Sequence, residues 1–84
     1  KRRTSNYLSL FEFVNIIGTR AQMIENGDEV YISIENKENS MEIAEAELRA
    51  GRCPLMIERR LATKGDIVYV EMWKASEMIL PLIS

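Results

Sequence analysis

The chain has 84 residues, of which 46% are hydrophobic and 29% are charged, and its formal net charge at pH 7 is -2. This composition is typical of a folded globular domain and excludes a disordered chain, and the small negative charge gives no general attraction to nucleic acid or to an anionic membrane. A domain of this length buries only about 60% of the surface that its unfolded chain would expose, so we expect marginal stability on its own.

The first predicted element is an amphipathic helix that follows an extended arm over residues 1–8. Ser9 and Glu12 have the spacing of a capping box, which places the start of the helix. Gly27 is expected to end it. At about 100° per residue, one apolar stripe of this helix is expected to supply the domain's own core. The stripe consists of Leu10, Phe13, Val14, Ile17, Ala21 and Ile24.

Two flanks of this helix lie outside that stripe. Ile16, Arg20 and Met23 lie on one side, and Phe11 and Gly18 lie on the other. A glycine in a helix interior costs about 1 kcal/mol relative to alanine, so the sequence is expected to need the missing side chain. The flanks have two interpretations: a wide arc buried within this domain, or a surface that another molecule approaches closely.

The next two elements are a strand and a second helix. Residues 30–35 alternate apolar and polar side chains, which predicts a half-buried strand. Asn39, with Glu42 three residues later, is expected to open a helix that ends at Gly51. Met41, Ala44 and Leu48 share one side of this helix, and its acidic residues are expected to lie outside.

The last part of the sequence predicts a β-hairpin. Residues 53–61 and 66–73 read as its two strands, and Gly65 in the connection supplies the positive φ that such a turn needs. Residues 74–84 close the chain with a helical turn. We therefore expect an α+β fold: two helices with a small antiparallel sheet made of the strand at 30–35 and the C-terminal hairpin.

The chemistry of an enzyme is missing from this sequence. With no histidine, a catalytic base would have to be a buried carboxylate, and the acidic residues fall mostly on predicted polar faces. The four glycines are far apart, so they form no phosphate-binding loop. Cys53 is the single cysteine and reads as a small buried hydrophobic residue in a reducing, intracellular compartment. We expect no cofactor and no metal site.

Two basic clusters leave one alternative function open. They lie at residues 1–3 and 58–60, but no aromatic residues are interleaved with them as a base-stacking platform requires. A solvated terminus and a salt-bridged strand explain the same residues. A free-standing adaptor or a small nucleic-acid-binding module is therefore the alternative to a role inside a larger complex.

Four motifs in order along the chain carry a family resemblance. They are T-x-x-Y-L-x-x-F-E from residue 4, G-T-R-A at 18–21, I-A-x-x-E-L at 43–48, and P-x-x-I-x-R at 54–59, with Trp73 near the end. This combination resembles the small subunit shared by the eukaryotic nuclear RNA polymerases, which is related to archaeal subunit K and bacterial omega. Residues 9–17 and 51–58 are also similar to versions encoded by large DNA viruses.

The resemblance implies a non-catalytic subunit of DNA-directed RNA polymerase. Members of the family hold the largest polymerase subunit and promote assembly and stability of the core enzyme, so DNA and RNA are contacted only through the complex. It implies one polymerase-subunit domain over 1–84, with an arm at 1–8, a globular core at 9–80 and a tail at 81–84. It also implies a nuclear location, or the host cytoplasm or virion for a virus-encoded protein. The residues expected to contact the largest subunit are Ile16, Gly18, Thr19, Arg20, Met23, Pro54 and Arg59.

Overall fold

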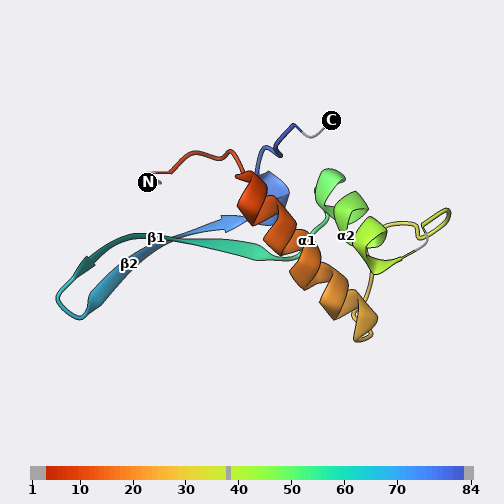
Figure 1. Ribbon diagram of the computed structural model, residues 1–84, viewed down its shortest axis with the longest axis horizontal. Helices are drawn as coiled ribbons and strands as arrows, with labels where there is room; N and C mark the ends of the chain where they lie inside the picture. The colour runs from red at the N-terminus through yellow and green to blue at the C-terminus, as the bar shows by residue number, and fades with distance from the viewer. Residues whose placement is uncertain (1–3, 38, 83–84) are drawn as a thin grey trace.

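The computed structural model describes residues 4–37 and 39–82, and it places two helices beside the base of a long β-hairpin (Figure 1). This arrangement confirms the predicted α+β fold with two helices and an antiparallel sheet. The elements in chain order are α1 (Leu10–Glu25), α2 (Ser40–Arg49), β1 (Met56–Lys64), β2 (Ile67–Lys74) and a short 3-10 helix (Ala75–Glu77).

Both helices begin at the predicted caps. The Ser9 hydroxyl accepts a hydrogen bond from the Glu12 N–H at 3.1 Å, and the Glu12 carboxylate accepts one from the Ser9 N–H at 3.0 Å, so the capping box is confirmed. The Asn39 side chain accepts from the Glu42 N–H at 2.9 Å at the start of α2. After α1, Gly27 adopts a φ of 100°, the left-handed conformation that ends helices.

The predicted hairpin is confirmed, but its first strand begins and ends three residues later than the predicted 53–61, and its second strand one residue later than 66–73. β1 pairs with β2 in antiparallel register, from Met56 opposite Lys74 to Lys64 opposite Ile67. The register shifts between Arg60 and Ala62, so one extra residue of β1 forms a bulge, which increases the local twist. Gly65 has a φ of 63° in the turn. The distal half of the hairpin extends away from the helices (Figure 1).

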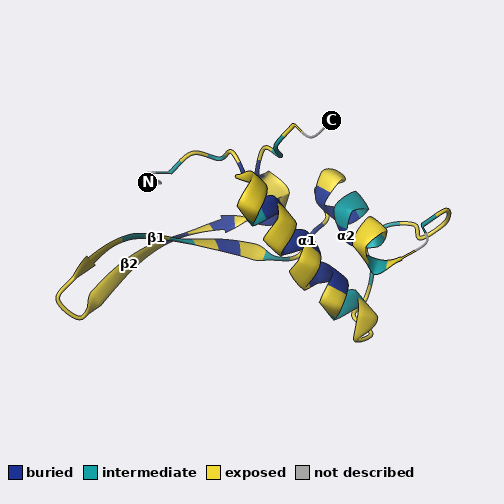
Figure 2. Cartoon of the chain, in the orientation of Figure 1, coloured by how far each residue is buried: buried dark blue, intermediate teal, exposed yellow. Residues whose placement is uncertain are grey.

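The hydrophobic core lies where the inner faces of α1 and α2 meet the base of the hairpin. Figure 2 shows buried residues on the inner sides of both helices and at the base of the strands, while the distal hairpin is exposed. The core residues are Leu8, Phe13, Ile16, Ile17, Ala21, Ala44, Leu48, Cys53, Ile57, Trp73, Ala75 and Met78.

The N-terminal arm is fixed to the C-terminal segment. The Leu8 N–H donates to the Ile79 carbonyl at 2.8 Å, and the Ile79 N–H donates to the Asn6 carbonyl at 2.7 Å, so the two segments run parallel in a short bridge. This pairing joins the two ends of the described chain. The predicted basic cluster at residues 1–3 and the last two residues of the predicted tail lie outside the described residues.

The predicted core face of α1 is wrong in part. Leu10 and Val14 are exposed, whereas Ile16 and Arg20 are buried together with Phe13. The buried arc is rotated because Arg20 points inward to a carboxylate on α2, a pairing that the periodicity of apolar residues cannot reveal. The acidic exterior predicted for α2 is wrong at Glu47, which is the buried carboxylate, whereas Glu42 and Glu45 do lie on the outer side. Met41, which we expected on the inner side of α2, is exposed.

The predicted strand at 30–35 is also wrong, because this segment is an irregular connection between the helices. Val30 and Ile32 are half-buried and Tyr31 and Ser33 are exposed, so the alternation of burial exists at these positions. The Tyr31 N–H donates to the Glu47 side chain at 2.9 Å instead of to a neighbouring strand. Among the described residues the sheet therefore has two strands rather than three.

Candidate partner-binding surface

The outer face of α1 exposes large apolar side chains. Phe11 is 75% exposed and Val14 is 56% exposed, and both lie on the same side of the helix as Asn15, Gly18 and Thr19 because their spacings are three, four, seven and eight residues. An apolar strip of this kind on a small domain is a candidate interaction surface.

Gly18 lies in the middle of this face. A Cβ atom built at this position would meet nothing within 4 Å among the described residues. Packing within the described part of the chain therefore gives no reason for a glycine in a helix interior, where glycine is unfavourable. Gly18 instead lies on the floor of a hollow of about 560 Å³. This hollow is lined by Val14, Asn15, Gly18, Thr19, Gln22 and Met23.

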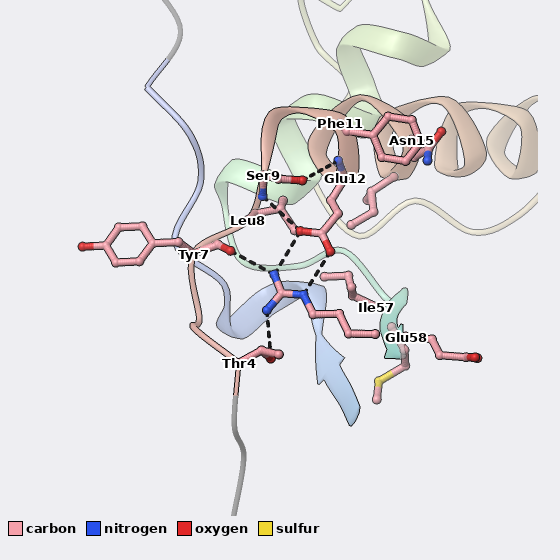
Figure 3. Close-up of a pocket in the computed structure, with 12 residues that line it drawn as sticks. Thr4, Tyr7, Leu8, Ser9, Phe11, Glu12, Asn15, Ile57 and Glu58 are labelled. Atoms are coloured by element: carbon pink, nitrogen blue, oxygen red, sulfur yellow. Dashed lines mark hydrogen bonds and ion pairs between the residues drawn. The ribbon is translucent and has the colours of Figure 1, made fainter. Parts of the chain in front are cut away.

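A larger hollow of about 760 Å³ lies between the first half of α1, the N-terminal arm and β1 (Figure 3). Phe11, Glu12 and Asn15 line it from α1, and the four successive residues 56–59 line it from β1. A small hollow of about 150 Å³ continues along the same seam, between Asn15 and Thr19 of α1 and residues 55–56. Since Asn15 lines all three hollows, they form one continuous surface, which we call the α1–β1 trough.

Arg59 fixes one end of the trough. Its Nε and Nη2 atoms each lie 2.9 Å from a Glu12 carboxylate oxygen, so the ion pair is bidentate (Figure 3). Nη2 also donates to the Tyr7 carbonyl at 2.9 Å, and Nη1 donates to the Thr4 hydroxyl at 3.1 Å. The Arg59 guanidinium lowers the pKa of Glu12 to about 2. Arg59 thereby joins β1, α1 and the arm.

Arg20 faces the opposite direction. Its side chain is 1% exposed and forms a bidentate pair with Glu47, with distances of 2.5 Å from Nε to Oε1 and 3.0 Å from Nη2 to Oε2. Nη2 also donates to the Glu29 carbonyl at 2.6 Å. Burial alone would raise the pKa of Glu47, but the Arg20 guanidinium and the Tyr31 N–H together hold this pKa below its usual value. The pair links α1, α2 and the connection between them.

The structure brings most of the predicted contact residues to one side of the molecule. Gly18 and Thr19 are exposed in the trough, and Met23 is half-buried at its end. Ile16 belongs to the core but also lines the seam. Arg59 lies at the far end. Pro54 is exposed just before β1 but lines none of the three hollows, and Arg20 lies outside the trough because it points to α2.

Several residues of the trough were not among the predicted contact residues, and Asn15 and Met56 are two of them. Asn15 lies outside both the apolar stripe and the two flanks of the predicted helix, and Met56 falls within the predicted strand at 53–61. Met56 is exposed while the neighbouring Ile57 is buried, because successive side chains of β1 point to opposite faces and the face of Ile57 packs on the core. The 75% exposure of Phe11, by contrast, agrees with its position on a flank left over by the apolar stripe.

Other kinds of site receive no support from the described residues. Cys53 is buried, and burial raises the pKa of its thiol, so it is a poor nucleophile. No group of three or more potential metal-ligating side chains occurs within residues 4–37 and 39–82. Neither helix in that part of the chain has the length and apolar character needed to cross a bilayer.

Comparisons with known proteins agree on one family. The model of the family described as RNA polymerase Rpb6 matches residues 2–55. The chain is 35% identical over 79 residues to DNA-directed RNA polymerases II and V subunit 6B of Arabidopsis thaliana, covering 94% of this chain and 52% of the relative. It is 33% identical over 82 residues to DNA-directed RNA polymerases I, II, and III subunit RPABC2 of Saccharomyces cerevisiae, covering 98% and 50%.

A third relative is the corresponding subunit of Dictyostelium discoideum, which is 33% identical over 77 residues, covering 92% of this chain and 55% of the relative. The chain thus spans about half the length of the curated relatives it matches. The matched segment includes both helices and residues 4–8 of the arm, and it ends one residue before β1. It therefore covers two of the three elements that form the trough, the arm and α1, but not β1. The chain belongs to the RNA polymerase Rpb6 family.

Proposed function

We propose that this protein is a non-catalytic subunit of DNA-directed RNA polymerase that holds the largest subunit and promotes assembly and stability of the core enzyme in transcription. The observation that carries the proposal is the exposed face of α1, where Gly18 has open space above it and Phe11 and Val14 face solvent. Surface burial against a large partner, rather than chemistry on a substrate, is the activity that this face supports.

The names of the relatives support the polymerase as the complex and the nucleus as the place of action. They are subunits of RNA polymerases I, II and III, or of II and V. The alternative location is the host cytoplasm or the virion, which applies to a virus-encoded protein.

The proposed contact surface is the α1–β1 trough. Gly18, Thr19 and Met23 contact the partner from α1. Pro54, which directly precedes the lining residue Leu55 and is not itself in the trough, contacts it from the segment before β1. Ile16 supports the floor of the trough, and Arg59 holds its far end in shape through Glu12. Arg20 acts as a positioning residue, because its pair with Glu47 fixes the rotation of α1 and thereby the direction in which Gly18 faces.

The alternative, a nucleic-acid-binding module, has weaker support. Within the basic cluster at 58–60, the Arg59 guanidinium is already paired with Glu12 and with carbonyl groups of the arm. A paired guanidinium of this kind contributes little to phosphate binding. The cluster at residues 1–3 lies outside the described part of the chain.

A substitution at Gly18 tests the proposed surface. Gly18→Leu places a side chain in the open hollow, so the fold accepts it while a closely approaching partner does not. We expect recovery of the largest subunit with the tagged chain to fall at least about tenfold, the effect of roughly 1.4 kcal/mol. Glu45→Leu, on the outer side of α2, is the matched control and is expected to leave recovery unchanged.

Thermal unfolding followed by circular dichroism shows whether both variants are folded, so that a loss of recovery can be assigned to the contact surface. Replacing a helix-interior glycine raises helix propensity, so the Gly18→Leu chain is expected to unfold at the same or a higher temperature than the unsubstituted chain. Undiminished recovery of the largest subunit with the folded Gly18→Leu chain would show that the proposed surface is wrong.

A further inference from the structure

The edge of β1 that faces away from β2 is open, and it lies in the α1–β1 trough. Within the described residues β1 pairs with β2 alone. Alternate side chains of a strand point to opposite faces, so a hollow lined by four successive residues lies at the edge of the strand rather than on a face. Residues 56–59 all line the trough. The trough therefore runs along the open edge of β1.

The hydrogen-bond pattern identifies which backbone groups point into the trough. The Ala75 N–H donates to the Leu55 carbonyl at 2.9 Å, one step before the register pair of Met56 and Lys74. In an antiparallel ladder, hydrogen-bonded pairs alternate with non-hydrogen-bonded pairs. Leu55 and Ile57 therefore direct their backbone groups toward β2, whereas Met56 and Glu58 direct theirs outward.

These outward groups have no backbone partner in the part of the chain that the structure describes. Outside the β1–β2 ladder, no hydrogen bond reaches the backbone N–H or C=O of Met56 or Glu58 from any residue in 4–37 or 39–82. Unpaired strand-edge groups of this kind are a template for a further strand. An extended peptide is the ligand that satisfies both the donors and the acceptors of such an edge.

The side chains along the trough define what such a peptide carries. Phe11 of α1 and Met56 of β1 are exposed apolar side chains that line it from opposite sides. Glu58 is exposed and has no ion pair among the described residues, whereas the other charged groups of the trough, Glu12 and Arg59, are paired with each other. An occupant with an apolar side chain beside Phe11 and a lysine or arginine beside Glu58 complements these groups.

We propose that an extended segment of the largest polymerase subunit docks in the α1–β1 trough as a third strand, hydrogen-bonded to the backbone of Met56 and Glu58. This inference rests on the proposed function and deepens it, because it assigns the mode of binding and the chemistry of the bound segment. The third strand completes a sheet that the chain alone leaves with two strands.

Hydrogen exchange in the purified polymerase tests the strand directly. The Ile57 N–H is bonded in the β1–β2 ladder and serves as the internal reference, protected with or without a partner. We expect the Met56 and Glu58 amides to exchange about a hundredfold more slowly in the assembled polymerase than in the chain dissociated from it. Unprotected Met56 and Glu58 amides beside a protected Ile57 in the assembled enzyme would overturn the inference.

A pair of proline substitutions provides a second, independent readout. Glu58→Pro removes an N–H that faces the trough, and Met72→Pro removes the N–H of the residue directly opposite, which faces away from β1 on the other edge of the hairpin. Because both positions lack a bond in the β1–β2 ladder, the two substitutions perturb the hairpin similarly.

The loss of one interfacial hydrogen bond predicts about a tenfold fall in recovery of the largest subunit for Glu58→Pro and little change for Met72→Pro. Glu58→Ala keeps the N–H, so recovery of the largest subunit is expected to fall less for this variant than for Glu58→Pro. Equal recovery for the two proline variants, with the unsubstituted chain still bound to the polymerase, would contradict the proposed third strand but not the proposed function. Failure of the unsubstituted chain to purify with the largest subunit would overturn the proposed function itself.

Discussion

At the scale of single residues, Glu47 carries a negative charge in a fully buried position. Arg20 and the Tyr31 N–H hold this charge, so removing the carboxylate leaves a buried guanidinium with less compensation. We expect Glu47→Ala to lower the free energy of unfolding by about 3 kcal/mol. Glu45→Ala, which breaks only the exposed pair with Arg49, is expected to lower it by about 0.5 kcal/mol or less.

Urea unfolding of these two α2 variants, followed by circular dichroism, measures both values. A double variant with leucine at positions 20 and 47 separates charge from packing, because replacing both partners of a buried pair by apolar residues is often nearly neutral. Equal destabilisation by Glu47→Ala and Glu45→Ala would show that the buried pair contributes no more to the stability of this chain than the exposed pair does.

The Glu12 and Arg59 pair predicts a defined pH dependence of stability. The pKa of Glu12 is lowered from 4.5 to about 2 in the folded chain, chiefly by the Arg59 guanidinium. The pair therefore stabilises the fold fully above about pH 4.5, and this contribution is lost as the pH falls toward 2. Its upper bound is about 3 kcal/mol, reduced by solvent screening because the carboxylate is partly exposed.

Thermal unfolding of the isolated chain between pH 2 and pH 6 measures this contribution. The Arg59→Ala variant removes the group that lowers the pKa, so its stability is expected to fall less steeply between pH 4.5 and pH 2. Identical slopes for the variant and the unsubstituted chain would assign the pH dependence to other carboxylates.

At the scale of elements, local signals placed the ends of the helices and the turn of the hairpin. Ser9, Asn39 and Gly65 act through neighbours two to four residues away, which the sequence displays directly. The faces of the elements depend on distant partners instead. Arg20 is turned inward by a carboxylate 27 residues later, so a prediction that places every charge outside rotates the helix incorrectly.

The open trough shows the same limit for the candidate site. Gly18 is unfavourable in a helix interior, so the sequence predicted that another molecule approaches closely there. No described residue lies within 4 Å of a Cβ atom built at Gly18, so packing within this chain does not explain the glycine. The open seam between α1 and β1 could not be predicted, because residues 30–35 have the alternating pattern of a third strand but do not form one. Alternation of apolar residues reports half-burial, and a strand also needs a neighbour.

At the scale of the whole molecule, the fold is more elongated than a compact domain with the same number of residues. Its radius of gyration is 14.3 Å and its longest extent is 49 Å, whereas 84 residues packed compactly have a radius of gyration of about 12 Å. The excess comes from the distal hairpin, which projects beyond the core (Figure 1). Ile67, Val68, Tyr69 and Val70 are all exposed there, on both faces of β2.

This exposure predicts that the isolated chain self-associates. A two-stranded hairpin with apolar side chains on both faces and two open edges presents a surface that other copies can cover, whereas in the polymerase a partner would cover it. Sedimentation velocity of the purified chain is expected to show oligomers that increase with concentration. Replacing Val68 and Val70 together by threonine keeps β propensity but removes two exposed apolar side chains, and is expected to give a monomer with an unchanged circular dichroism spectrum.

Ile34→Thr provides the control, since Ile34 lies in the connection between the helices and is 58% exposed, more than Val68 and Val70 at 44% each. This variant is expected to self-associate as the unsubstituted chain does, because a single exposed side chain far from the hairpin creates no extended patch. A monomeric unsubstituted chain at every concentration measured would show that the distal hairpin is tolerated in water. The elongated shape would then provide no reason for a covering partner at the hairpin, and the requirement for a partner would rest on the α1–β1 trough alone.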